Sequence, residues 1–320
     1  MTVNATVQVT SNGLHSKPPL LARLLRLYLC SRLRGSTRLT YSMAHRLESL
    51  QHVPLDIPHW APVYVDLRLG SAHTMLMESP YKGLWRELDE VKIMQRFVRA
   101  GDVALDIGAN VGLHSILLSR LVGPQGKLFA FEPNAELLPS LRYTLAHLGN
   151  VRLHPIALSN RHAESQLFVP PDDSVASLAD WTVTSPIFSH DGPAHVVNCS
   201  ERRLDDLVES GVIPQPDFIK CDVEGAELQV FQGALNTLNR PDAPIVLFEA
   251  NECASRAFGV EVSAAKHFLS ALENASYRFL EIRPGGNLVK LAEPGSNFMN
   301  VLAIPESKLS FWPDLQGGKS

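Results

Sequence analysis

Apolar and polar positions alternate in blocks of regular length from residue 102 onward. Short apolar runs of strand length occupy residues 103–105, 127–131, 151–158, 217–221 and 245–248. Longer stretches with apolar positions at helical spacing follow them, at residues 113–122, 135–148, 204–210, 226–238 and 261–275. Strands that alternate with helices in this way form βαβ units. The pattern therefore predicts an α/β fold with a mostly parallel sheet and helices on both faces.

Other stretches flank or interrupt this alternation. Residues 51–90 hold short apolar runs between prolines and predict a lead-in of strands and loops, with a helix over 85–98. Residues 160–200 form a polar insertion that contains proline and serine. Residues 277–282 and 298–304 predict a pair of strands that closes the sheet.

These patterns divide the chain into an N-terminal basic arm with its lead-in over residues 1–84, one α/β domain over 85–305 and a tail over 306–320. Of the 320 residues, 45% are hydrophobic and 19% are charged, which excludes a disordered or fibrous chain. The net charge of −4 hides a split, because residues 1–50 have seven basic residues and one acid, so they carry +6 and the remainder −10. The acidic body is unsuited to phosphate backbones, and we expect no nucleic-acid partner.

The arm contains an apolar run at residues 20–29, which Arg23 and Arg26 interrupt. A membrane span needs about 18 apolar residues, and no clear cleavage site follows the run, so neither a span nor a signal peptide is predicted. Residues 18–34 predict either a helix packed on the body with solvated arginines or an interfacial helix on anionic lipid. The four cysteines are dispersed, as in reduced cytosolic proteins. We therefore expect a cytoplasmic protein, with peripheral membrane contact through residues 18–34 as an alternative.

Four of the predicted strands run directly into an acidic residue: Asp106, Glu132, Asp222 and Glu249. If these strands are parallel and share one sheet, the four carboxylates lie along the edge where such sheets bind their ligands. A buried carboxylate without a partner is unfavourable. One such acid is commonly a helix cap, but four together indicate a ligand with hydroxyls or positive charge.

The first strand-to-helix turn, residues 106–112, has the sequence DIGANVG and lacks the G-x-G-x-x-G of dinucleotide sites. Asp106 adds negative charge where a pyrophosphate would lie, which argues against a NAD-dependent oxidoreductase. Glu132 follows Gly112 by 20 residues and ends the second strand, where an acid accepts hydrogen bonds from ribose hydroxyls. S-adenosylmethionine (SAM), a phosphate-free nucleoside with a cationic end, satisfies this set, with Asp106 on its amino group.

Residues 222–227, DVEGAE, place three carboxylates around a glycine turn between a strand and a helix. Asp222 or Glu224 could accept the proton of an attacking hydroxyl, and His114 is a third candidate for this base. Alternatively, these acids, Glu227 in particular, could stabilise the N-terminus of the following helix through its dipole. They could also hold a divalent metal ion through oxygen ligands, an interpretation that we do not favour.

Four blocks in this order resemble the FkbM-type SAM-dependent methyltransferases: residues 106–112, 131–134 (FEPN), 156–159 (IALS) and 217–227 (DFIKCDVEGAE). The resemblance covers about residues 85–305. It implies a class I methyltransferase fold, a Rossmann-like seven-stranded sheet with a reversed final hairpin, and O-methylation of a sugar, a glycan or a related small-molecule hydroxyl.

The matched positions also imply which residues bind the cofactor. They are Asp106, Gly108, Asn110 and Gly112 around the methionine part, Glu132 on the ribose with Asn134 in the same cofactor-binding block, and Ala157 to Ser159 near the adenine. Residues 174–178, SVASL, resemble a serine-containing segment that precedes the active site in this family.

Three alternatives to this function stay open at this point. A NAD-dependent oxidoreductase and a non-catalytic, membrane-associated scaffold would share the architecture, although intact acids at all four strand ends argue against a decayed site. A nucleic-acid or protein methyltransferase is disfavoured because no Asn-Pro-Pro-aromatic sequence follows the fourth strand. No motif in residues 51–90 or 160–200 indicates the methyl acceptor.

Overall fold

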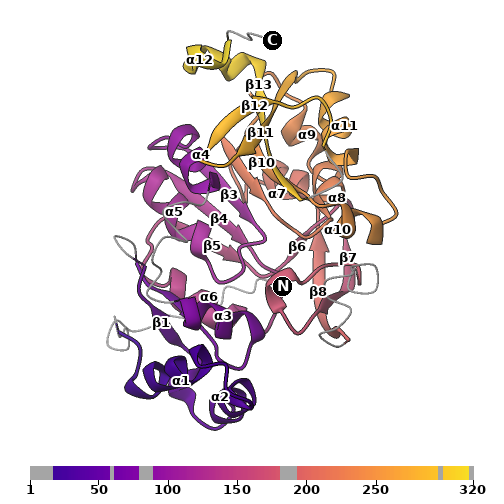
Figure 1. Ribbon diagram of the computed structural model, residues 1–320. Helices are drawn as coiled ribbons and strands as arrows, with labels where there is room; N and C mark the ends of the chain where they lie inside the picture. The colour runs from indigo at the N-terminus through magenta and orange to yellow at the C-terminus, as the bar shows by residue number, and fades with distance from the viewer. Residues whose placement is uncertain (1–16, 58–60, 79–88, 181–192, 295–297, 317–320) are drawn as a thin grey trace.

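The computed structural model of the chain describes residues 17–57, 61–78, 89–180, 193–294 and 298–316. Its main sheet has eight strands in the order β12–β11–β13–β10–β9–β3–β4–β5 (Figure 1). Their bounds are β3 (Val103–Ile107), β4 (Lys127–Phe131), β5 (Val151–His154), β9 (Phe218–Cys221), β10 (Ile245–Ala250), β11 (Tyr277–Arg283), β12 (Asn287–Lys290) and β13 (Met299–Pro305). The five strands from β10 to β5 are parallel, and β13, β11 and β12 run antiparallel to their neighbours. This confirms the parallel sheet and its reversed final hairpin, with β12 as an eighth strand where seven were predicted.

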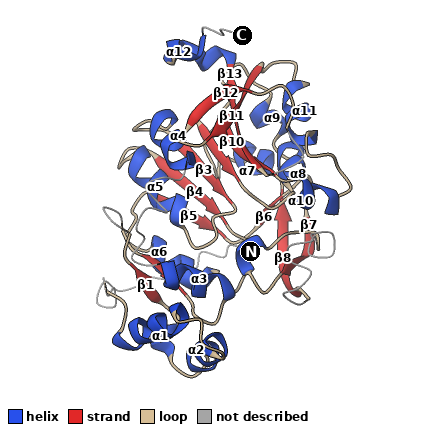
Figure 2. Ribbon diagram, viewed as in Figure 1, coloured by secondary structure: helices blue, strands red, loops and turns tan. Residues whose placement is uncertain are grey.

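Helices cover both faces of this sheet, as predicted (Figure 2). They are α4 (Asp89–Phe97), α5 (Leu113–Val122), α6 (Leu138–Leu145), α7 (Leu204–Glu209), α8 (Glu227–Gln232), α9 (Leu235–Leu238), α10 (Glu252–Ala257) and α11 (Ala264–Ser270). Successive strand residues point to opposite faces, so Leu105 packs in the core beneath α8 and α11, whereas Ala104 packs in the core beneath α4 and α5. Because both faces are buried, the central strands are continuous apolar runs in the sequence.

Two predicted elements are divided in the structure. The run over residues 151–158 forms β5 and the short strand β6 (Ala157–Leu158), because Pro155 between them has no N–H to continue a ladder. The helix over residues 226–238 is divided into α8 and α9 at Gly233. A Cβ at Gly233 would lie 1.9 Å from the Ser159 carbonyl oxygen, so only glycine permits this approach.

The insertion over residues 160–200 contains a second sheet that the sequence analysis did not predict. Strands β7 (Ala163–Val169) and β8 (His195–Arg202) pair antiparallel, and β6 adds to β8 in parallel. Exposed Glu164 and Gln166 alternate with more buried residues along β7, so its polar composition conceals a strand pattern. The predicted helix over 261–275 is shorter, since α11 spans only Ala264–Ser270, and α10 is an additional helix.

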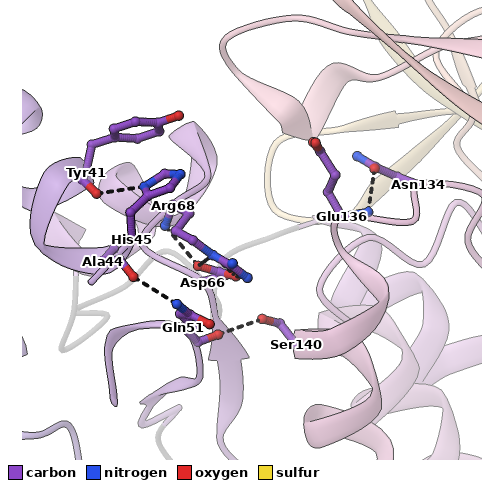
Figure 3. Close-up of polar contacts among 9 residues, drawn as sticks. All are labelled: Tyr41, Ala44, His45, Gln51, Asp66, Arg68, Asn134, Glu136 and Ser140. Atoms are coloured by element: carbon purple, nitrogen blue, oxygen red, sulfur yellow. Dashed lines mark hydrogen bonds and ion pairs between the residues drawn. The ribbon is translucent and has the colours of Figure 1, made fainter. Parts of the chain in front are cut away.

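The arm and lead-in form a lobe at the end of the molecule opposite α12 (Figure 1). This lobe contains α1 (Leu20–Cys30), α2 (Ser36–Ala44), η2 (Glu48–Leu50), a two-stranded sheet of β1 (Val53–Leu55) and β2 (Val63–Val65), and α3 (Gly70–Glu78). Gln51 ties the lobe to the body, because its Nε2 donates to the Ala44 carbonyl at 3.0 Å and its own carbonyl accepts from Ser140 Oγ on α6 at 3.3 Å (Figure 3).

The predicted boundaries between arm, domain and tail stay predictions. The helix predicted over 85–98 corresponds to α4 from Asp89, and its start lies outside the described residues. In the predicted tail, η4 (Glu306–Phe311) and α12 (Pro313–Gln316) follow β13.

Candidate active site

A cavity of about 330 Å³ lies at the carboxyl ends of the parallel strands. Its wall combines the turns after β3, β4 and β9 with β6, the segment 173–178 and one residue of α3, Met75. The four strands that were predicted to end in acids are neighbours in the order β10–β9–β3–β4, all parallel. Glu132 and Asp222 directly follow β4 and β9 as predicted, whereas Asp106 and Glu249 lie within β3 and β10 and do not line the cavity.

Seven of the eleven predicted site residues line this cavity: Gly108, Asn110, His114, Glu132, Ala157, Asp222 and Glu224. The other four, Asp106, Gly112, Asn134 and Ser159, lie behind the wall. Asp106 lies within β3 and not at its end, and its fully buried carboxylate accepts from Ser115 Oγ at 2.6 Å. The expected contact of Asp106 with a ligand amino group is thus not provided by the cavity wall.

The backbone of the two turns around the cavity is tightly constrained. Gly108 has φ +81°, and a Cβ there would lie 1.8 Å from the Asp222 carbonyl oxygen. Asn110 and Glu224 are two of only three described non-glycine residues with positive φ, at +53° and +52°. Such backbone strain persists only where the surrounding structure enforces it, and it is frequent at ligand sites.

Two backbone amides hold the Glu132 carboxylate in place. Asn110 N donates to its Oε2 at 2.7 Å, and Asn134 N donates to its Oε1 at 2.8 Å. A carboxylate has about four acceptor positions, so Glu132 retains capacity for hydroxyl donors from the cavity. Burial raises the pKa of Glu132 to about 7, although the two amide hydrogen bonds lower it. The Asn134 backbone thus positions Glu132, although Asn134 itself does not line the cavity.

Lys220 is the site residue that the sequence analysis missed. Its Nζ lies 3.2 Å from Asp222 Oδ2 and 3.5 Å from Asp106 Oδ1, and it donates to the Gly108 carbonyl at 3.2 Å. Its side chain is buried and lines the cavity. A single charged residue within the apolar strand β9 is the signal that could have identified it, because a buried lysine requires partners.

Lys220 decides which of the clustered carboxyls is ionised. Burial raises the pKa of Asp222, but the charge and hydrogen bond of Lys220, with smaller contributions from His114 and Glu249, together outweigh burial, and the pKa of Asp222 lies below its usual value. The Asp222 side chain is 36% exposed, and it lines the cavity. Burial and the neighbouring Asp222 charge raise the pKa values of Glu224 and Glu249 well above the usual range. Asp222 is therefore the member of this cluster whose ionised form is favoured, whereas the charged forms of Glu224 and Glu249 are disfavoured.

Among the described residues, Asp222, Glu224 and Glu249 have carboxylate oxygens within 4.8 Å of one another. Such a group could hold a divalent cation through oxygen ligands. The ammonium of Lys220 supplies a positive charge 3.2 Å from Asp222 in the same cluster.

His114 adds a neutral polar group to the same wall. Burial and the charge of Lys220 lower its pKa to about 4, so the imidazole is neutral at pH 7. Its Nε2 is buried and has no hydrogen-bond partner among the described residues. An imidazole nitrogen in this state can bind a hydroxyl group that enters the cavity.

The serine-containing segment also lines the cavity, through residues 174 and 176–178. Ser177 Oγ donates to the Glu224 carbonyl at 2.8 Å, and Asn110 Nδ2 donates to the Ser174 carbonyl at 3.4 Å. Buried Asp173 accepts from both N and Oγ of Ser71, at 2.9 and 2.8 Å, which ties this wall to α3. The wall is thus built from segments about 100 residues apart, a pairing that no local pattern indicates.

Comparison with known proteins gives one family and several relatives. The methyltransferase FkbM domain matches residues 106–279. The hexuronic acid methyltransferase AglP of Haloferax volcanii is 27% identical over 173 residues, which cover 52% of this chain and 66% of AglP. The 2-O-methyltransferase NoeI of Sinorhizobium fredii is 26% identical over 175 residues, which cover 50% of this chain and 70% of NoeI. A solved SAM-dependent methyltransferase from Aquifex aeolicus has 15% identity and a TM-score of 0.37, covering 69% of this chain and 90% of that one.

Proposed function

The chain belongs to the FkbM methyltransferase family, and from this premise we propose that it is a SAM-dependent O-methyltransferase acting on a hydroxyl of a sugar, a glycan or a related small molecule. The names of two relatives support the acceptor class, since one methylates hexuronic acid and the other is a 2-O-methyltransferase. The observation that carries the proposal is one cavity that contains both Glu132, after β4, and Asp222, after β9.

The cavity suits SAM on three counts. Glu132 offers a fixed carboxylate for ribose hydroxyls, held by the amides of Asn110 and Asn134. Phe131, Ile156 and Leu158 give the neighbouring wall an apolar surface suited to an adenine ring. Acidic residues around the cavity match a cationic, phosphate-free nucleoside. We assign Glu132 to the ribose and the strand β6 region to the adenine.

The residues around Asp222 suit proton transfer from a hydroxyl. SAM, when bound, supplies an electrophilic methyl group on a sulfonium. The Asp222 carboxylate would accept the proton that the acceptor hydroxyl loses on methylation, and the spent cofactor would leave as the neutral thioether S-adenosylhomocysteine. Lys220 keeps Asp222 ionised and oriented at 3.2 Å, and the free Nε2 of His114 holds the acceptor hydroxyl. We assign the base to Asp222 and not to Glu224, because burial and the Asp222 charge raise the pKa of Glu224.

The test is methyl transfer from labelled SAM to oligosaccharides that contain hexuronic acid, compared with analogues in which single hydroxyls are replaced by hydrogen. We expect label on an oxygen of the intact sugar and none on the matching deoxy analogue. Asp222→Asn should lower the rate by about 10²–10⁴-fold, the usual size of general-base catalysis, while SAM affinity changes little. Glu261→Gln on the exposed surface is the control and should match the wild type. Transfer at the wild-type rate by Asp222→Asn would contradict the assigned base, and label on nitrogen or sulfur would contradict O-methylation.

A further inference from the structure

Large exposed apolar side chains concentrate on the arm. Of the thirteen such residues in the described part of the chain, seven lie between residues 20 and 47: Leu20, Leu24, Leu27, Leu33, Leu39, Tyr41 and Leu47. This segment of 28 residues belongs to a chain of 320. Single exposed leucines need no explanation on a protein surface, but a cluster of them indicates an interaction site.

Helix α1 is apolar on two opposite faces. Ala22, Leu25 and Leu29 point inward and are buried against the lobe. Leu20, Leu24 and Leu27 occur at i, i+4 and i+7, on one face of the helix, and they are 69%, 53% and 65% exposed. The inward face accounts for the packing of α1. The outward face has no partner among the described residues, and packing alone does not explain it.

The charges around this apolar face are uniformly basic and unpaired. From Lys17 to Arg46 the chain has seven basic residues and no acid. None of the six arginines in this stretch forms an ion pair with another described residue. By contrast, at least nine of the thirteen described arginines after residue 50 are ion-paired. The arm thus lacks the internal acids that neutralise arginines elsewhere in the molecule.

We propose that residues 17–47, the arm surface, dock on an anionic lipid bilayer. Exposed leucines between unpaired arginines match the two components of such a surface, acyl chains beneath negatively charged headgroups. No helix within the described ranges is long and apolar enough to cross a bilayer, so the contact is interfacial. A protein partner is less well matched, because protein hot spots favour tryptophan and tyrosine, whereas six of the seven exposed apolar residues here are leucine.

Docking of the arm surface on a bilayer would also orient the cavity relative to that bilayer. Cys30 Sγ at the end of α1 donates to the Met77 carbonyl of α3 at 3.7 Å. Helix α3 supplies Met75 to the cavity wall. The cavity therefore lies one helix layer from the arm surface.

Co-sedimentation of the full chain with vesicles tests this proposal without requiring methyl transfer. The vesicles contain phosphatidylcholine alone or with about 30% phosphatidylserine. We expect at least about tenfold more bound protein on the anionic vesicles at about 0.05 M salt, and loss of most of that excess at about 0.5 M salt because screening weakens arginine–headgroup attraction. Replacing both Leu24 and Leu27 by Glu should remove the binding at low salt.

The controls separate docking from misfolding and from a protein interface. Leu235→Glu alters a leucine that is 41% exposed on α9 and should bind as the wild type does. Replacing Arg23 and Arg38 by Gln changes only exposed side chains, and should weaken vesicle binding several-fold with an unchanged melting temperature. Absence of binding to anionic vesicles at low salt would overturn the proposal. So would self-association in light scattering that the Leu24 and Leu27 substitutions abolish, because the surface would then bind a second copy of the chain.

Discussion

The cavity and the arm surface both concentrate charge, but they do so in opposite ways. In the cavity, Lys220 lies within 3.5 Å of two carboxylates, and the amides of Asn110 and Asn134 hold Glu132. On the arm surface, six arginines have no ion pair with any described residue. Charged groups held in place by partners indicate a ligand whose own polar groups match those fixed positions. Charges without partners point to an external surface that is itself charged and needs no fixed geometry.

Substitutions in the two regions should also affect folding stability differently. Removing a partner from the cavity leaves a buried charge uncompensated, so it should affect stability as well as chemistry. Removing an exposed arginine or leucine from the arm surface should affect binding alone. Each of the following experiments tests one side of this comparison.

The largest expected effect on stability comes from Lys220→Met. The substitution leaves the fully buried Asp106 carboxylate with only Ser115 as a partner, and it should reduce the free energy of unfolding by about 3–5 kcal/mol at pH 7. The deficit should shrink as the pH falls, because protonation then relieves the uncompensated carboxylates. Chemical denaturation at pH 7 and pH 5 measures both effects. Lys290→Met at an exposed position is the control, with a change within about 0.5 kcal/mol, and equal stability of the two variants would contradict the role of Lys220.

A smaller effect is expected from the pKa of Glu132, which burial raises to about 7. Ribose hydroxyls bind the ionised carboxylate, so SAM affinity should be about tenfold weaker at pH 6 than at pH 8. Titration calorimetry at the two pH values measures this difference. Glu132→Gln should flatten the profile, and an unchanged profile in that variant would assign the titration to another group.

The stability of the ligand-free protein should vary in the opposite direction. Glu132 and Glu227 both have pKa values near 7 in the folded chain, above the ordinary value of 4.5. The stability that they contribute is therefore complete below pH 4.5 and is lost as the pH rises through 7. Thermal melts of the wild type and Glu132→Gln across this range test the sign.

The smallest effect is expected on the outward face of α1. Leu24→Glu should change the free energy of unfolding by no more than about 0.5 kcal/mol, because the side chain is 53% exposed and has little packing to lose. Leu25→Ala on the inward face of the same helix should cost about 2–5 kcal/mol, because Leu25 is buried. Denaturation curves compare the two. A similar loss for both would show that the outward leucines are covered in solution.

The sheet and its acidic edge were predictable because their signals are local. Apolar strands that alternate with helices indicated the parallel order, and the acids after β4 and β9 follow directly from the sequence. The prediction that Asp106 directly follows its strand was wrong by two residues. Strand β3 continues to Ile107, so Asp106 lies inside the sheet and faces Ser115 on α5 instead of the cavity.

The remaining parts of the site depend on contacts between distant segments. The pairing of β7 with β8 and the tie between Ser71 and Asp173 bring a second sheet and α3 to the cavity, and neither has a local signature. The partners of Lys220 come from β3 and from the residue after β9, so its role requires the three-dimensional register of these strands. Ionisation of Asp222 in preference to Glu224 likewise follows from the position of Lys220.

The central claim is that the cavity beside Glu132 binds SAM, and titration calorimetry with SAM tests it most directly. We predict saturable binding to the wild type and a loss of about 1.5–3 kcal/mol in Glu132→Ala, the size of hydrogen bonds to a charged acceptor. Glu136→Ala, four residues later with a side chain that is 40% exposed, should bind as the wild type does. Equal affinity of wild type and Glu132→Ala, or no binding to the folded wild type, would contradict the claim.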